Sequence, residues 1–145
     1  MAMLKRVDHL NVQVPPEKED EAKHFYGEIL GLSQLTKPDN LGRSGAHYCL
    51  SEEPWYEPHL GIARGASVVD IGLNQALRNH LGFQVDDLAA ARQAFEAAGI
   101  EISGADPARS EERDFYQERF FVRDPGGNQL EIMEARRPHS ARPPG

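Results

Sequence analysis

Three histidines and one glutamate occupy matching places in two halves of the chain, and their types are those of a metal-ligand set. His9 and His80 each begin a short patterned segment, whereas His59 and Glu131 lie in two later ones. Imidazole nitrogens and a carboxylate oxygen are ligands for Zn, Fe, Mn, Ni or Co. A divalent ion held by these four side chains would keep coordination positions for water or a substrate.

Each candidate ligand falls on the polar side of a predicted strand. Apolar residues alternate with polar ones around His9 and His80, and Glu131 lies between Leu130 and Ile132. This period of two is that of a β-strand, in which successive side chains point to opposite faces. The four segments are 7–14, 59–63, 79–85 and 129–133.

A turn signal precedes the strand that carries Glu131. The sequence 124–128 reads Asp-Pro-Gly-Gly-Asn, in which Asp-Pro starts a turn and the next residues tolerate positive φ. A carboxylate in the middle of an apolar strand is costly to bury without a partner. Glu131 therefore either faces water or has a partner such as a metal ion.

The same order of elements occurs twice. The pattern His-Leu-x-x-Gln-Val at His9 returns at His80, and Pro58-His59-Leu60 matches Leu130-Glu131-Ile132, about 70 residues later in both cases. Each half reads strand, helix, strand, strand, strand. If the first and last strands of each half are neighbours, and the halves pair about a pseudo-twofold axis, the four candidate ligands converge.

The remaining elements follow from periodicity and from turn residues. Helices are predicted from the acidic start at 17–21 to Gly31 and, after a cap at Asp86, to Gly99. The other predicted strands are 33–37, 46–50, 100–103 and 119–123, and 105–117 is a polar loop. Eight residues are predicted to be buried between helix and sheet: Leu10, Val12, Phe25, Leu81, Phe83, Phe95, Leu130 and Ile132.

These elements predict an α+β fold with two βαβββ modules. The modules are predicted to form a curled mixed β-sheet around a cleft, with the helices on the outer face. We expect a first module at 1–64, a connector at 65–76, a second module at 77–135 and a disordered tail at 136–145.

Composition excludes several classes of function. The chain has 145 residues and a net charge of −7, so nucleic acid is an unfavourable partner. It has one cysteine and neither a membrane-length apolar run nor a signal-peptide pattern. These features predict a cytoplasmic protein that has no membrane partner.

Several motifs together resemble the vicinal oxygen chelate superfamily, over about residues 6–134. This superfamily includes glyoxalase I, extradiol dioxygenases, fosfomycin-resistance proteins, methylmalonyl-CoA epimerase and bleomycin-binding proteins. The motifs are Val7-Asp8-His9-Leu10, Phe25-Tyr26 with Leu30-Gly31-Leu32, His59-Leu60-Gly61, Asn79-His80-Leu81, and Asp124-Pro125-Gly126-Gly127-Asn128 with Leu130-Glu131.

The resemblance implies a cleft centred on a divalent metal ion and a homodimer. Its metal ligands fall on His9, His80 and Glu131, with the fourth on His59, where glyoxalase I usually has Glu. Only Glu131 could then carry protons at the substrate's α-carbon, so it is the candidate catalytic residue. Glyoxalase-like lyase or isomerase chemistry is expected on a small, oxygen-chelating substrate.

Other functions stay open. With Fe(II), the set His9, His80 and Glu131 would suit extradiol-type dioxygenase chemistry. A small-molecule or antibiotic-binding protein of the resistance type, without turnover, is the alternative, and a structural or regulatory relic of the fold is a third. Six further residues lie in segments that could reach a cleft: Arg43, Tyr48, Trp55, Arg113, Tyr116 and Arg119.

Overall fold

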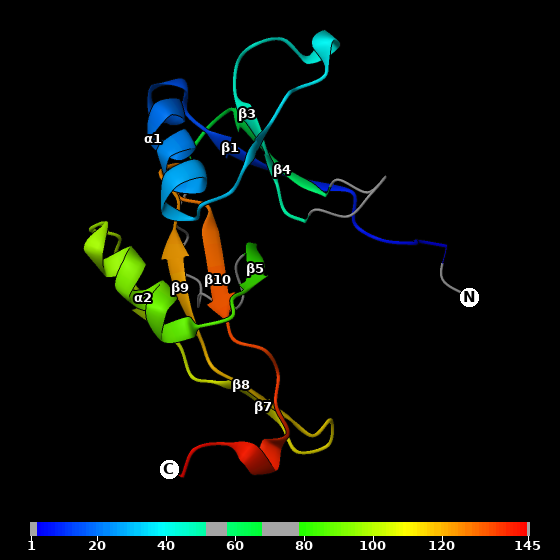
Figure 1. Cartoon of the computed structure of the whole chain (residues 1–145), viewed down its shortest axis with the longest axis vertical. Helices are drawn as coiled ribbons and strands as arrows, with labels where there is room; N and C mark the ends of the chain where they lie inside the picture. Colours follow the sequence, from blue (N-terminus) through cyan, green and yellow to red (C-terminus); the bar gives the residue numbers. More distant parts are fainter. Residues whose placement is uncertain (1–2, 52–57, 68–78, 145) are drawn as a thin grey trace. The chain divides into compact units, whose positions relative to one another are not determined.

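The structure is a computed structural model in which residues 3–51, 58–67 and 79–144 are described (Figure 1). The chain divides into two compact units, and each of them has its own four-stranded sheet. The first unit is Met1–Val69 with Asp124–Asn128, and the second is Asp70–Arg123 with Gln129–Gly145. The predicted α+β class, built from two modules, is confirmed.

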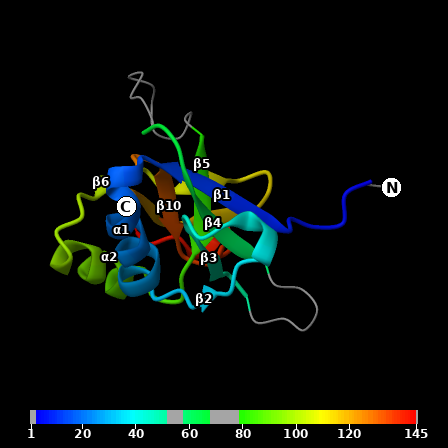
Figure 2. The same ribbon diagram turned by 90° about the horizontal axis from the view of Figure 1, so that it is seen from above.

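The sheet of the first unit has the strand order β1-β4-β3-β2. Strand β1 runs parallel to β4, whereas β3 is antiparallel to both β4 and β2. Figure 2 shows β1, β4 and β3 from above. The first and last strands of the module are therefore neighbours, as the ligand prediction requires. The bounds are β1 (His9–Val14), β2 (Gln34–Leu35), β3 (Ala46–Cys49) and β4 (His59–Arg64).

A helical segment covers the apolar face of this sheet. It begins as a 3-10 turn, continues as an α-helix and ends as a π-helix, before Gly31 reverses the chain at φ 72°. Phe25 and Tyr26 are buried, and the Tyr26 ring lies 6.5 Å from that of Tyr48 on β3. The helical elements are η1 (Pro16–Lys18), α1 (Glu19–His24) and η2 (Phe25–Ile29).

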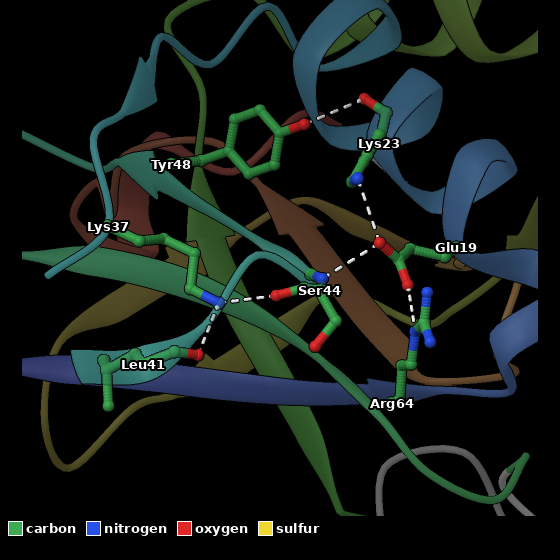
Figure 3. Close-up of polar contacts among 8 residues, drawn as sticks. Glu19, Lys23, Lys37, Leu41, Ser44, Tyr48 and Arg64 are labelled. Atoms are coloured by element: carbon green, nitrogen blue, oxygen red, sulfur yellow. Dashed lines mark hydrogen bonds and ion pairs between the residues drawn. The ribbon is translucent and has the colours of Figure 1, made fainter. Parts of the chain in front are cut away.

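A buried carboxylate joins α1 to the end of β4 and to the loop before β3 (Figure 3). Glu19 accepts from Arg64 Nε at 2.5 Å and from the Gly45 N–H at 2.9 Å, and it pairs with Lys23 Nζ at 2.9 Å. These partners, Arg64 and Lys23 above all, lower the pKa of Glu19 to about 2. The carboxylate therefore ties the helix to β4 and to the loop that contains the 3-10 turn η3 (Asp39–Leu41).

The second unit repeats the arrangement with the strand order β5-β10-β9-β6. Strand β5 runs parallel to β10, and β9 is antiparallel to both β10 and β6. Strands β9 and β10 have the predicted bounds. The bounds are β5 (His80–Gln84), β6 (Ser103–Gly104), β9 (Arg119–Arg123) and β10 (Gln129–Met133).

Helix α2 (Leu88–Ala97) belongs to this unit. Its cap is Asp87 rather than the predicted Asp86, because the Asp87 side chain accepts from the Ala90 N–H at 2.9 Å. Phe95 of α2 packs edge-on against Phe120 of β9, with ring centroids 5.9 Å apart. None of the helices in the described parts of the chain has the length and apolar character of a membrane span.

The core prediction is right at five positions and wrong at three. Val12, Phe25, Phe95, Leu130 and Ile132 are buried. The other three are only half-buried. They lie on β1 and β5, which are outermost strands of their sheets and have one neighbouring strand each. An edge strand is covered less completely than a central one. The three residues predicted wrongly are Leu10, Leu81 and Phe83.

The segment predicted as a polar loop at 105–117 contains a hairpin. Strands β7 (Ala108–Ser110) and β8 (Phe115–Gln117) pair antiparallel. Tyr116 exchanges backbone hydrogen bonds of 2.8 and 3.0 Å with Arg137, and a 3-10 turn, η5 (His139–Ala141), follows. The segment predicted to be a disordered tail therefore has defined contacts with the hairpin.

The predicted turn at Asp124–Asn128 is present and belongs to the first unit. Asp124 accepts from the Gly126 and Asn128 N–H groups at 2.9 and 2.8 Å, and from the Tyr26 hydroxyl at 2.7 Å. Burial raises the pKa of Asp124, although these hydrogen bonds oppose the change. A Cβ on Gly126 would lie 2.6 Å from the Gln13 carbonyl, so glycine is required there.

Candidate functional site

His80 and Glu131, two of the predicted ligands, meet on neighbouring strands of the second unit. His80 Nε2 lies 3.0 Å from Glu131 Oε2. The Glu131 residue is 8% exposed, whereas the His80 side chain is 25% exposed. The imidazole nitrogen of His80 and a carboxylate oxygen of Glu131 therefore lie side by side on β5 and β10.

The distance between these two atoms suits a shared ion. Two donor atoms that bind one ion at about 2.1 Å lie about 3 Å apart at a right angle and about 3.4 Å apart at a tetrahedral angle. The His80–Glu131 separation of 3.0 Å is close to these values, and it is also that of a direct hydrogen bond or ion pair. The chemistry of the donors fits an ion, since imidazole and carboxylate both bind divalent transition metals. The pair could therefore supply two adjacent ligands.

Arg119 of β9 binds the other oxygen of the same carboxylate. Its Nη1 donates to Glu131 Oε1 at 2.7 Å, while its Nε donates to the Asp106 carbonyl at 2.9 Å. The Phe121 ring lies beside both partners of Glu131. The His80 ring is edge-on to it with centroids 5.8 Å apart, and the Arg119 guanidinium is 5.6 Å from its centroid. Glu131 is thus held between a cation and an imidazole.

The other two predicted ligands, His9 and His59, meet in the first unit. They are partners in the register of β1 and β4, and their rings stack with centroids 4.9 Å apart. Asp8 Oδ1 lies 2.8 Å from His9 Nδ1. Stacked rings direct their nitrogens along parallel planes, so the two imidazoles lie together without enclosing a common point.

A third histidine, His47 of β3, continues this stack on the other side. Its ring lies 4.6 Å from that of His59. Burial lowers the pKa of His47, and the neighbouring His59 and Lys37 act in the same direction. Sequence reasoning missed His47. Its signal was the alternation of Ala46-His47-Tyr48-Cys49, in which Ala46 and Tyr48 are buried and His47 faces away from the core.

The two modules differ in register by two residues. His9 is opposite His59 in the first unit, whereas His80 is opposite Gln129 in the second, and Glu131 is opposite Gly82. A shift of two keeps Glu131 on the same face as His80, because side chains alternate with a period of two. A Cβ on Gly82 would lie 3.0 Å from Met133 Cε and, at 3.9 Å, in ordinary contact with Glu131 Oε2.

The structure brings the predicted ligands together in two pairs. Within residues 3–51, 58–67 and 79–144, no group of three or more His, Cys, Asp or Glu side chains has the arrangement of a metal site. Of the six residues expected to reach a cleft, Arg119 contacts a predicted ligand and Trp55 lies outside the described residues. Two open grooves in the first unit, at 34–45 and beside α1, are not lined by the predicted ligands.

Comparisons with known proteins agree with this fold. A crystal structure of a protein from Bacillus anthracis, described as belonging to the glyoxalase family, is 31% identical, with a TM-score of 0.66; the match covers 92% of this chain and 98% of that one. The fosfomycin resistance protein FosX from Listeria monocytogenes is 14% identical, with a TM-score of 0.68 over 92% and 93% of the two chains.

A third solved structure, the antibiotic-binding protein TnmS3 from Streptomyces sp. CB03234, is 21% identical, with a TM-score of 0.59 over 92% and 98%. At this identity, and at that of FosX, the likeness shows the fold alone. No curated protein matches the chain. The model of one family matches residues 6–132, and the chain therefore belongs to the Glyoxalase/Bleomycin resistance protein/Dioxygenase superfamily.

Proposed function

We propose that this chain is a metal-dependent member of the superfamily in which His80 and Glu131 bind a divalent ion of Zn, Fe, Mn, Ni or Co. That His9 and His59 are further imidazole ligands, with His59 the fourth, stays a prediction from the sequence. The observation that carries the proposal is the 3.0 Å separation of His80 Nε2 and Glu131 Oε2. A nitrogen and an oxygen donor at this distance suit one shared ion.

The proposed reaction is lyase, isomerase or dioxygenase chemistry on a small substrate that binds through its oxygens. When bound, a divalent ion supplies Lewis-acid stabilisation of negative charge that develops on a substrate oxygen. Neutral imidazoles and one carboxylate leave such a site with net positive charge, which favours an oxyanionic substrate. Arg119, 2.7 Å from Glu131, adds to that positive charge.

Glu131 is the proposed proton carrier, since it is the single carboxylate among the four ligands. In an isomerisation of an α-hydroxy carbonyl substrate, the C–H bond of the hydroxyl-bearing carbon would break as an O–H bond forms on Glu131. The C–H electron pair would form a C=C bond, and the carbonyl π pair would move to the carbonyl oxygen. Glu131 would then return the proton to the former carbonyl carbon, and the hydroxyl proton would move to the oxygen on that carbon, so that the new carbonyl forms at the first carbon. Phe121 is 2% exposed and lies beside His80, where its ring would exclude water from one side of the imidazole.

A second candidate function is small-molecule binding without turnover. Arg119 and His80 contact one oxygen each of Glu131, so the carboxylate has partners in the absence of an ion. The structural likeness to an antibiotic-binding protein agrees with this alternative. The two functions differ in their need for metal, and this difference makes them separable.

Titration of the metal-free protein with Co²⁺ tests the proposal. Binding should be detected by calorimetry and by the visible absorption bands of the ion. His80→Ala and Glu131→Gln should each weaken it at least about 10-fold, because the loss of even an outer-shell partner of a ligand typically costs about 10- to 100-fold in metal affinity. His24→Ala is the matched control, because His24 is exposed on α1. If the wild-type protein binds no Co²⁺, small-molecule binding without metal becomes the better account.

We also propose that the protein is a homodimer, as the resemblance of its sequence to the superfamily implies. The mass in solution at micromolar concentration tests this proposal. A dimer mass supports it, and a monomer mass contradicts it.

A further inference from the structure

Arg119 is fixed in place by more than its salt bridge to Glu131. One guanidinium nitrogen donates to Glu131 Oε1 at 2.7 Å, and Nε donates to the Asp106 carbonyl at 2.9 Å. The guanidinium also lies 5.6 Å from the Phe121 ring centroid, and the side chain is 19% exposed. Because the backbone carbonyl and the ring hold it independently, the guanidinium would stay beside Glu131 whatever else binds there.

The two oxygens of Glu131 are therefore divided between two partners. Oε1 faces Arg119, whereas Oε2 faces His80 at 3.0 Å. The residue is 8% exposed, and a carboxylate so buried is strongly unfavourable without a counter-charge. Arg119 supplies that charge, so the second unit does not need an ion to accommodate Glu131.

We infer that Arg119 is a resident counter-ion of Glu131, which stabilises the metal-free protein and keeps metal binding weak and exchangeable. This inference rests on the proposed function, because it concerns an ion bound through Glu131 Oε2. The guanidinium and the ion share one carboxylate and carry charges of the same sign, so each weakens the other's attraction to it.

Removing Arg119 should therefore destabilise the metal-free protein and strengthen metal binding. The metal-free protein loses the partner of a buried carboxylate, whereas the metal-loaded protein regains a counter-charge from the ion. A residue that only positioned Glu131 would act differently, because its loss would disorder the ligand and weaken metal binding. The sign of the change in affinity separates the two roles.

The test compares Arg119→Met with Arg119→Lys in the full chain. Methionine keeps an unbranched apolar stem against Phe121 and removes the charge, whereas lysine keeps the charge and loses the planar fork. We expect Arg119→Met to lower the Tm of the metal-free protein and to lower the Kd for Co²⁺ about 10-fold. Arg119→Lys should have a Kd close to that of the wild-type protein. Added Co²⁺ should return the Tm of Arg119→Met towards the wild-type value.

Arg137→Met is the matched control. It removes an arginine from another Arg–Glu pair of the same unit, Arg137 with Glu134 at 3.1 Å, without touching Glu131. Its Kd for Co²⁺ should equal that of the wild-type protein. In addition, the double variant Arg119→Met/Glu131→Gln should recover the metal-free Tm, because both charges have been removed.

The outcomes distinguish this inference from the proposed function. If the wild-type protein binds Co²⁺ and Arg119→Met binds it equally or more weakly, the counter-ion role is wrong while the metal function stands. If only Arg119→Met binds Co²⁺, the counter-ion role is supported. If neither binds Co²⁺, both the inference and the proposed function are wrong.

Discussion

Glu19 should make the stability of the protein depend on pH through a single buried carboxylate. Its side chain is 8% exposed and contacts Arg64, Lys23 and the Gly45 N–H. The fall of its pKa from 4.5 to about 2 corresponds to about 3 kcal/mol. Because the Arg64 side chain is 53% exposed, solvent screens part of this interaction, and we expect about 2 kcal/mol.

The sign of the effect follows from the lowered pKa. A carboxylate whose pKa is lower in the folded state stabilises the protein above the unfolded value of 4.5. This contribution declines as the pH falls below 4.5 and is lost near pH 2. Glu19→Gln removes the charge and should therefore cost about 2 kcal/mol at neutral pH and much less at about pH 3.

Urea unfolding of the wild-type protein and of Glu19→Gln at several pH values measures this difference. Glu21→Gln is the control, because Glu21 pairs with Lys18 at the surface and its side chain is 59% exposed. The control should change the free energy of unfolding by less than about 0.5 kcal/mol at neutral pH. A gap between wild type and Glu19→Gln that stayed constant from neutral to acidic pH would refute the role of the charge.

Two further changes test the turn and the loop of the first unit. Tyr26→Phe removes the 2.7 Å hydrogen bond to the buried Asp124 and should cost about 1–2 kcal/mol in urea unfolding; an unchanged midpoint would mean that the bond contributes nothing. Gly45→Ala should lower the Tm severely, because φ is 73° and the new Cβ would lie 2.0 Å from the Ile62 carbonyl. Gly42→Ala, with φ 71° but open space around the Cβ, should cost only about 1 kcal/mol, and equal losses would show that the contact is unimportant.

Much of the fold follows from local patterns that the sequence displays directly. Strand β10 alternates between polar and apolar residues over Gln129-Leu130-Glu131-Ile132, and β9 is a short apolar run between two arginines. The glycines that end both helical segments, Gly31 and Gly99, have φ 72°. The hairpin β7–β8 was missed because its residues are mainly polar. It also has contacts from later in the chain: the Arg136 guanidinium lies 4.9 Å from the Phe115 ring, and Arg137 exchanges backbone hydrogen bonds with Tyr116.

The proximity of His80 and Glu131 was predictable from the sequence, and the contacts around them were less so. The alternation of side chains along each strand predicts that Glu131 and His80 share a face, and in the structure Glu131 Oε2 lies 3.0 Å from His80 Nε2. The two-residue shift in register and the bridge from Arg119 depend on how strands pair. Pairing is a tertiary property that alternation within one strand does not report. His47 was readable from alternation, but the equivalent position in the second half of the chain holds Arg119 rather than a histidine.

Metal content at equilibrium tests the central claim most directly. The wild-type protein and Glu131→Gln would be dialysed side by side against equal concentrations of Zn²⁺, Mn²⁺, Ni²⁺ and Co²⁺, and then analysed for each element. We predict that the wild-type protein takes up divalent metal in excess of the buffer, in an amount that rises towards one ion per chain as the metal concentration is raised. Glu131→Gln should take up much less, with an unchanged circular dichroism spectrum. Equal metal content in the two proteins, or none in the wild-type protein, would contradict the assignment of Glu131 as a metal ligand.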